Sequence, residues 1–141
     1  MRLPAENSGL AWTRRSFEVA GLEHNNPIPM ISRIGPYVHS SGINGKNRDT
    51  GLLPADIAGQ CEQMFRNVGI VLEQAGAHPG QVLQMTFFLP SRELRPYINK
   101  HWLEMFPDEH SRPARHVHTE PNLTGGMLVQ CEFFAIVPVE G

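Results

Sequence analysis

The chain has 141 residues, enough for one domain whose hydrophobic core needs no metal or disulfide. Apolar residues make up 40% of the chain and charged residues 18%, with a formal net charge of -2 at pH 7. This balance argues against a protein that binds nucleic acid by neutralising phosphates, and there is no long basic run. Cys61 and Cys131 fall in periodic segments, so we expect buried, reduced thiols.

The amino terminus has no apolar run of signal length, and no stretch of 18 apolar residues occurs in the sequence. We therefore expect a soluble, cytoplasmic chain that does not enter a membrane. Residues 1–25 are predicted to form an irregular arm, in which residues 17–20 can add one edge strand. Residues 26–141 are predicted to form the domain.

Two short β-type runs, 30–34 and 37–43, flank Gly35-Pro36 and predict a first hairpin. A long helix is predicted to begin near Pro54 and Asp56, two residues that suit a helix amino terminus. Its apolar residues recur at helical spacing along one face: Ile57, Cys61, Met64, Phe65, Val68 and Leu72. Gly76 and the His78-Pro79-Gly80 sequence are expected to end it.

Residues 82–89 alternate as a strand does, and both faces of this strand are expected to be at least partly covered. The predicted faces are Leu83, Met85, Phe87 and Leu89 on one side, with Val82 and Phe88 on the other. A second helix is predicted to start near Pro96 and to stop at Pro107.

Residues 111–137 contain two more alternating runs joined by a turn-rich connection at 120–126, which predicts a second hairpin. The expected order is β-β-α-β-α-β-β. This order favours an α+β fold with a single sheet and both helices on one face. Both faces of the last strand are substantially apolar, so we expect the helix-free face to pack against another subunit.

Arg115 is the first candidate for chemistry, because its guanidinium presents a rigid fork that matches a carboxylate. The alternative is a surface or interface arginine paired with Glu132 or Glu120. His116 and His118 share one face of a strand, but no third ligand follows at a recognisable metal spacing, so no metal is expected. There is also no phosphate loop and no Gly-x-Ser-x-Gly nucleophile motif, and no cofactor is expected.

Several short motifs, in this order and spacing, resemble the RidA/YjgF family of imine and enamine deaminases over roughly residues 26–138. They are Asn26-Pro-Ile-Pro, Ser40-Ser-Gly, Thr50-Gly, Pro54-Ala-Asp with Gln60 and Asn67-Val, Ala75-Gly, Thr86, Asn99 and Pro113-Ala-Arg. The resemblance implies a chorismate-mutase-like fold and a homotrimer with ligand clefts between subunits.

The resemblance also implies roles for individual residues. Arg115 matches the arginine that binds the substrate carboxylate in active members of the family. Ser41 with Gly42, and Asn99 on the second helix, match residues that complete the ligand site.

Three positions depart from the pattern of active members. Ile28 stands where they carry a tyrosine, Gln130 where they carry a glutamate, and Val117 where they carry a cysteine. The change at 117 alters only the side chain, so a backbone carbonyl is still present at this position. Glu132 lies on the same strand face as Gln130, about 7 Å further along.

The resemblance implies hydrolysis of a 2-imino or enamine acid, of the 2-iminobutanoate or 2-iminopropanoate type, to a 2-keto acid and ammonia. Arg115 would hold the carboxylate, Gln130 would orient a water, and Glu132 or His118 would supply a base, because an amide cannot take a proton. Two alternatives stay open. One is a weakly catalytic or non-catalytic regulatory trimer that binds small carboxylates, and the other is a deaminase or hydrolase dedicated to a larger acid.

Overall fold

Two helices form where the sequence places apolar residues at helical spacing. In the computed structural model, which describes residues 12–138, α2 spans Ile57–Gln74 and α3 spans Arg95–Met105. Asp56 caps α2 by accepting a hydrogen bond from the Gly59 amide at 2.8 Å. This carboxylate satisfies one of the amides that a helix amino terminus leaves unpaired. Within the described part of the chain, neither helix is long and apolar enough to cross a bilayer.

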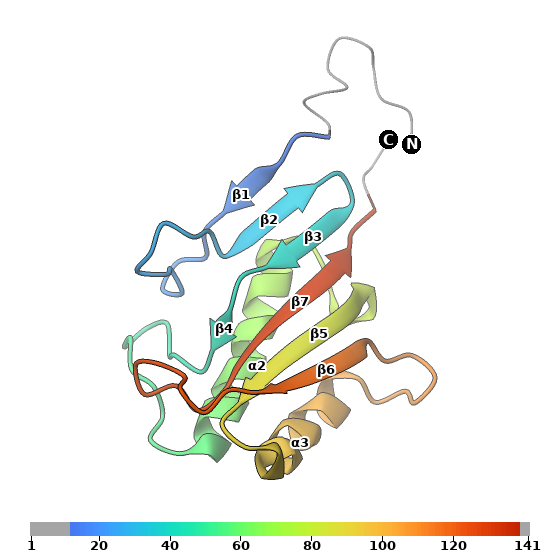
Figure 1. Ribbon diagram of the computed structural model, residues 1–141. Coiled ribbons are helices and arrows are strands. Elements are labelled where there is room, and N and C mark those ends of the chain that lie inside the picture. The colour runs from blue at the N-terminus through green and yellow to red at the C-terminus, as the bar shows by residue number, and fades with distance from the viewer. Residues whose placement is uncertain (1–11, 139–141) are drawn as a thin grey trace.

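The strands form one sheet that lies in front of both helices in Figure 1. They are β1 (Arg15–Phe17), β2 (Ile31–Ile34), β3 (Tyr37–Ser40), β4 (Ile43–Asn44), β5 (Val82–Leu89), β6 (Ala114–Thr119) and β7 (Gln130–Ile136). The order across the sheet is β1-β2-β3-β7-β5-β6, and β4 pairs with β7 beyond the end of β3. Short 3₁₀ turns, η1 (Pro79–Gln81) and η2 (Arg92–Leu94), precede β5 and α3. The expected α+β class, single sheet and pair of helices on one face are confirmed.

The predicted second hairpin is wrong. β6 and β7 are not neighbours, because β5 lies between them, parallel to β6 and antiparallel to β7. The α3 crossover returns the chain to the same end of the sheet from which β5 starts, so β6 runs parallel to β5. The connection from 120 to 129 then carries the chain past β5 to the other side. β6 is therefore an edge strand.

Two smaller predictions also need correction. The run from 37 to 43 is not one strand: it breaks at Ser41-Gly42 into β3 and β4. In β5 the pairing with β7 shifts between Val82 and Gln84, so Leu83 is the extra residue of a β-bulge. The bulge turns Leu83 outward, where it is 55% exposed, and buries Val82 beside Met85.

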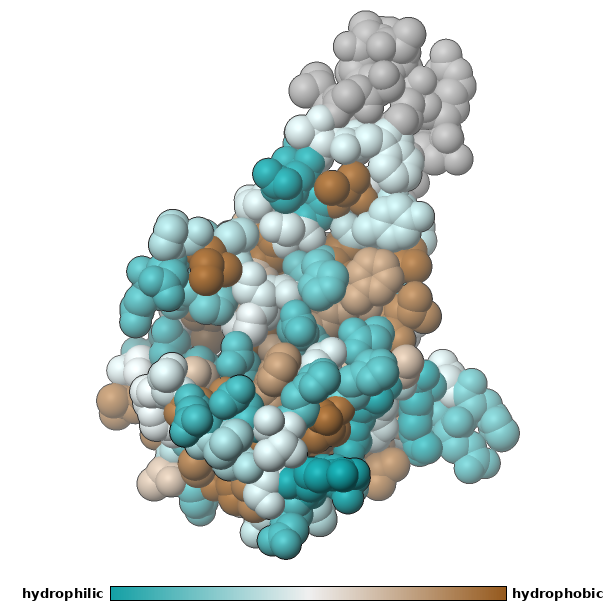
Figure 2. Space-filling model, viewed as in Figure 1, coloured by the Kyte–Doolittle hydropathy of each residue, from teal (hydrophilic) through white to brown (hydrophobic). Residues whose placement is uncertain are grey.

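The hydrophobic core lies between the sheet and the helices. β7 contributes Cys131, Phe133 and Ala135, all fully buried, and α2 covers them with the apolar stripe seen in the sequence. The opposite face of the sheet is half-exposed. Figure 2, viewed as Figure 1, shows hydrophobic and hydrophilic side chains mixed over it.

Both cysteines are free thiols within this core, as predicted. Burial raises the pKa of the Cys61 thiol to about 12, and burial together with the nearby Cys61 and Glu132 raises that of Cys131 further. In the unfolded chain each thiol ionises near pH 9, so above that pH the unfolded state releases protons that the folded state retains.

We therefore predict that the free energy of unfolding is unaffected by the thiols below about pH 9 and falls as the pH rises further. The expected decline is about 1.4 kcal/mol per pH unit for each thiol. Urea unfolding between pH 8 and 11 measures it, with Cys61→Ala as the comparison. An equally steep decline in that variant would contradict the assignment.

Candidate functional site

The break between β3 and β4 forms a corner at Ser41-Gly42. Here the Ser40 hydroxyl accepts a hydrogen bond from the Phe133 amide at 2.9 Å. The Ser41 hydroxyl donates to the Pro29 carbonyl at 2.6 Å, which holds the loop carrying Ile28 against the corner. Ile28 is itself 43% exposed. The corner is therefore fixed by side-chain hydrogen bonds on both sides.

His24 supports the same corner from the chain before β2. Its Nε2 lies 2.9 Å from the Gly42 carbonyl, which fixes Nε2 as the protonated nitrogen because a carbonyl only accepts. The other ring nitrogen, Nδ1, is buried and has no partner among residues 12–138. The ring thus orients the Gly42 peptide.

Gln130, the first residue of β7, lies directly over Gly42. A Cβ built on Gly42 would overlap the Gln130 side-chain amide, so the absence of a side chain at 42 makes room for that amide. Gly42 and Gln130 line a cavity of about 320 Å³ together with Phe88, Glu120, Leu123 and Glu132. The structure therefore brings together three of the residues singled out in the sequence, Gly42, Gln130 and Glu132.

This cavity opens on the helix-free face of the sheet. Gln130 lies opposite Phe88, and Phe88 lies opposite His118 on β6, so the three share one face. The His118 ring stacks on Phe88 with centroids 5.6 Å apart, beside the cavity. Glu132 lies one step further along β7, opposite Thr86.

Arg115 lies on the other face of the sheet. It pairs with Met85, which is fully buried under the helices. Its guanidinium carbon lies 5.2 Å from the Trp102 ring centroid and 5.7 Å from that of Phe87. The two rings meet edge to face, with centroids 6.0 Å apart, and form an aromatic platform for the cation.

The surroundings of Arg115 are electropositive. Partial burial, and then the charge of Arg95, lower the pKa of Arg115. Within the described chain no carboxylate oxygen lies within 4.0 Å of its guanidinium, so Arg115 does not pair with Glu132 or Glu120 of the same copy. A guanidinium held half-buried beside a second cation is suited to bind an anion.

The remaining candidates lie near Arg115. Asn99 is exposed on α3, three residues before Trp102, and this spacing puts both on one side of the helix. Val117 is half-buried on β6, opposite Phe87, and follows Arg115 on the same face. The candidate residues thus form two groups on opposite faces of one sheet. One group surrounds Arg115 on the face that the helices cover, and the other surrounds Gln130 on the helix-free face.

Two fully buried polar side chains on α2 hold the loops around the cavity. Asn67 donates to the carbonyls of Asn44 and Lys46, both at 2.8 Å. Gln60 donates to the Pro54 and Gly126 carbonyls and accepts from the Leu128 amide at 2.8 Å. These bonds fix the chain before Gln130 and after Gly42. The sequence motifs include both residues but do not show what they bind.

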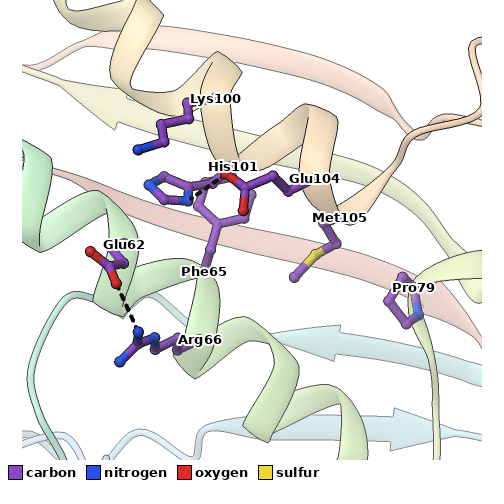
Figure 3. Close-up of a pocket in the computed structure, with 8 residues that line it drawn as sticks. All are labelled: Glu62, Phe65, Arg66, Pro79, Lys100, His101, Glu104 and Met105. Atoms are coloured by element: carbon purple, nitrogen blue, oxygen red, sulfur yellow. Dashed lines mark hydrogen bonds and ion pairs between the residues drawn. The ribbon is translucent and has the colours of Figure 1, made fainter.

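A larger cavity, of about 580 Å³, lies between α2 and α3 on the opposite side of the molecule (Figure 3). Several of its polar groups contact one another: Glu62 and Arg66 are 2.7 Å apart, and His101 Nδ1 lies 3.6 Å from the Glu104 carboxylate. None of the candidate residues lines it, and its charges are already partly satisfied. Its size alone does not make it the site.

The described residues contain no group of three or more His, Cys, Asp or Glu side chains placed to hold a metal ion. The family resemblance pointed to Arg115, Gly42 and Gln130, but it gave no role to Trp102, Arg95 or Glu120. An indole at helical spacing indicates an ordinary core residue, and Glu120 falls in a segment that the sequence predicts to be a turn. Only the packing of α3 against β6, and the cavity beside Gln130, show what they adjoin.

Known proteins match most of the length of this chain. The sequence model of the endoribonuclease L-PSP family matches residues 28–137. The Escherichia coli K12 protein named 2-iminobutanoate/2-iminopropanoate deaminase is 31% identical over 114 residues, covering 73% of this chain and 88% of that protein. Schizosaccharomyces pombe mmf1, named as mitochondrial, is 28% identical over 133 residues, covering 85% and 81%.

Solved structures give the same fold. A Rid-family protein of unknown function from Yersinia pestis superposes with a TM-score of 0.81 at 26% identity, covering 89% of this chain and all of that one. RidA from an Antarctic Psychrobacter also gives 0.81, at 21% identity, covering 87% and 99%.

We predict that Gly42→Ala displaces the Gln130 amide while leaving the fold intact. The added Cβ meets the far end of a flexible side chain, which can rotate away, so we expect a loss of less than about 1 kcal/mol in the free energy of unfolding. Chemical denaturation measures this loss, and a crystal structure of the variant would show the displaced amide. An unmoved Gln130 would contradict the prediction.

Proposed function

Because the chain belongs to the RidA/YjgF family, the endoribonuclease L-PSP family of the matching sequence model, we propose that it hydrolyses small 2-imino or enamine acids to 2-keto acids and ammonia. The observation that carries the proposal is the Arg115 guanidinium. It is half-buried on an aromatic platform and has no carboxylate partner in the described chain.

Arg115 binds the substrate carboxylate in this proposal. Its planar fork can donate two parallel hydrogen bonds to one carboxylate, and the Trp102 ring limits the orientations that the fork can take. Asn99, on the same side of α3, can donate or accept a further bond from its side-chain amide. A 2-imino acid held in this way presents its imine carbon at a defined distance from the arginine.

Water attacks that carbon, and Gln130 orients it. The amide accepts a hydrogen bond from the water but cannot remove its proton. The helix-free face offers Glu132 and His118 as the groups that the sequence indicated for that step. Since 2-imino acids also hydrolyse unaided, much of the rate gain comes from holding substrate and water in the reactive geometry.

The two halves of this site come from different copies of the chain. Arg115 and Gln130 lie on opposite faces of one sheet, so a single copy cannot present both to one small ligand. The half-exposed apolar residues Tyr37, Phe134 and Ile136 on the helix-free face support its contact with a neighbouring copy. A homotrimer, in which each cleft takes one half from each of two copies, satisfies both requirements.

Two other functions are supported by single observations. Gln130 in place of a carboxylate favours a regulatory trimer that binds small carboxylates without turning them over. The exposed apolar Ile28 beside Ser41 favours a deaminase or hydrolase dedicated to a larger acid.

We predict that wild-type protein accelerates keto-acid release and that Arg115→Ala loses about 10- to 100-fold of this acceleration, the worth of one charge-assisted anchor. An amino-acid oxidase or a lyase generates 2-iminopropanoate, 2-iminobutanoate or a longer 2-imino acid, and semicarbazide competes for it. Arg66→Ala, which removes an exposed arginine already paired with Glu62, is the matched control.

Saturable carboxylate binding without ammonia release would select the regulatory trimer. Activity on a longer acid alone would select the dedicated enzyme. No acceleration and no carboxylate binding at Arg115 would overturn both the proposal and these alternatives.

We further predict that two impaired variants complement each other. A chain with Arg115→Ala and a chain with Gln130→Ala and Glu132→Ala are mixed in equal amounts, unfolded and refolded together. If each site takes one half from each of two copies, about one quarter of the sites in random mixed oligomers regain both intact halves. Refolded mixtures that stay as inactive as the separate variants would show that the halves do not meet between copies.

A further inference from the structure

We propose that Glu120 is the catalytic base of this chain, in place of the carboxylate missing at position 130. This assignment rests on the proposed function. It is carried by the cavity on the helix-free face, which holds Glu120 and Gln130 together. The sequence offered Glu120 only as a possible partner of Arg115, a pairing that the structure does not contain.

The backbone fixes Glu120 at the end of an edge strand. Its amide donates to the Leu89 carbonyl at 2.6 Å, which extends the β5–β6 pairing by one residue beyond Thr119. Side chains alternate along a strand, so Glu120 follows His118 on the helix-free face. That face carries Phe88 and Gln130 at the neighbouring positions.

A tight turn fixes the carboxylate itself. Glu120 Oε1 accepts a hydrogen bond from the Asn122 amide at 3.1 Å. Oε2 makes no hydrogen bond to any residue from 12 to 138, so it is available to a water in the cavity. A carboxylate held by one oxygen and open at the other is suited to accept a proton from a bound water.

The cavity distinguishes Glu120 from the other two candidate bases. His118 does not line it, and its ring stacks on Phe88 beside the cavity. Glu132 does line it, but on a central strand, opposite Thr86 and within the face that we propose a neighbouring copy covers. Glu120 lies at the rim.

The chemical step balances with water as the only co-reactant. The water oxygen bonds to the imine carbon while its proton passes to Glu120, and the π electrons of the C=N bond move to nitrogen, which takes up a proton from solvent. The protonated Glu120 then gives its proton to the amino nitrogen. The C–N bond breaks, ammonia leaves with that electron pair, and the hydroxyl loses its proton to give the keto acid.

The test compares kcat and KM for Glu120→Gln with those of wild type, Arg115→Ala and the control Glu73→Gln, an exposed glutamate on α2. We expect Glu120→Gln to lower kcat by about 10²- to 10⁴-fold with little change in KM. Glu120 is exposed, so the variant should fold, and its circular dichroism and oligomeric state are checked against wild type.

A rescue variant separates catalysis from a merely structural role. Adding Gln130→Glu to Glu120→Gln returns a carboxylate to the same cavity, and we expect it to restore kcat to within about tenfold of wild type. A structural defect at the turn would not be repaired by a change on β7.

Undiminished kcat in Glu120→Gln would overturn the proposal. In that case a large loss in Glu132→Gln would assign the base to Glu132. Failure of the deaminase function looks different: wild type itself would then give no acceleration over the uncatalysed reaction.

Discussion

The alternation of side chains across β5, β6 and β7 is the constraint on which the site depends. Because neighbouring residues of a strand point to opposite faces, the register of these three strands assigns every side chain to one face. Arg115 falls with Met85 and the helices, and Gln130 falls with Phe88 on the open side. A slip of one residue in the β5–β6 pairing would put Arg115 on the open face. Val117 packs opposite Phe87 on the core face, next to the Met85–Arg115 pair. The same slip would move Val117 out of the core, and this cost opposes it.

α2 supports this register through polar contacts as well as apolar ones. Gln60 and Asn67 are nearly or fully buried, and together they make five hydrogen bonds to backbone groups of β4 and of two loops. Each such bond contributes about 1 kcal/mol net, and losing the side chain would leave buried carbonyls unpaired at a larger cost. The helix therefore sets the positions of the chain before Gln130 and after Gly42.

Much of the fold could be predicted from the sequence, and the failures have physical reasons. The 18-residue helix α2 was clear because apolar residues recur along it at helical spacing, and the 11-residue helix α3 was indicated by the prolines near its two ends. The second hairpin failed because two strands adjacent in sequence read the same whether or not a third strand lies between them. The bulge at Leu83 cannot be recognised from the alternation of apolar and polar residues in β5, because it is defined by the pairing with β7. For the site, the family motifs located Arg115, Gly42 and Gln130, whereas the Trp102 platform depends on a contact between α3 and β6.

The Ser41-Gly42 corner has a consequence for affinity. Three side-chain hydrogen bonds hold its backbone. The Ser40 hydroxyl accepts from the Phe133 amide, in place of a backbone bond between the strands. The Ser41 hydroxyl donates to the Pro29 carbonyl, and the His24 ring donates to the Gly42 carbonyl. The conformational entropy of this backbone is therefore lost on folding rather than on ligand binding. A small acid has few atoms with which to offset an ordering penalty, so a rigid corner lets a weakly interacting ligand be held in one pose.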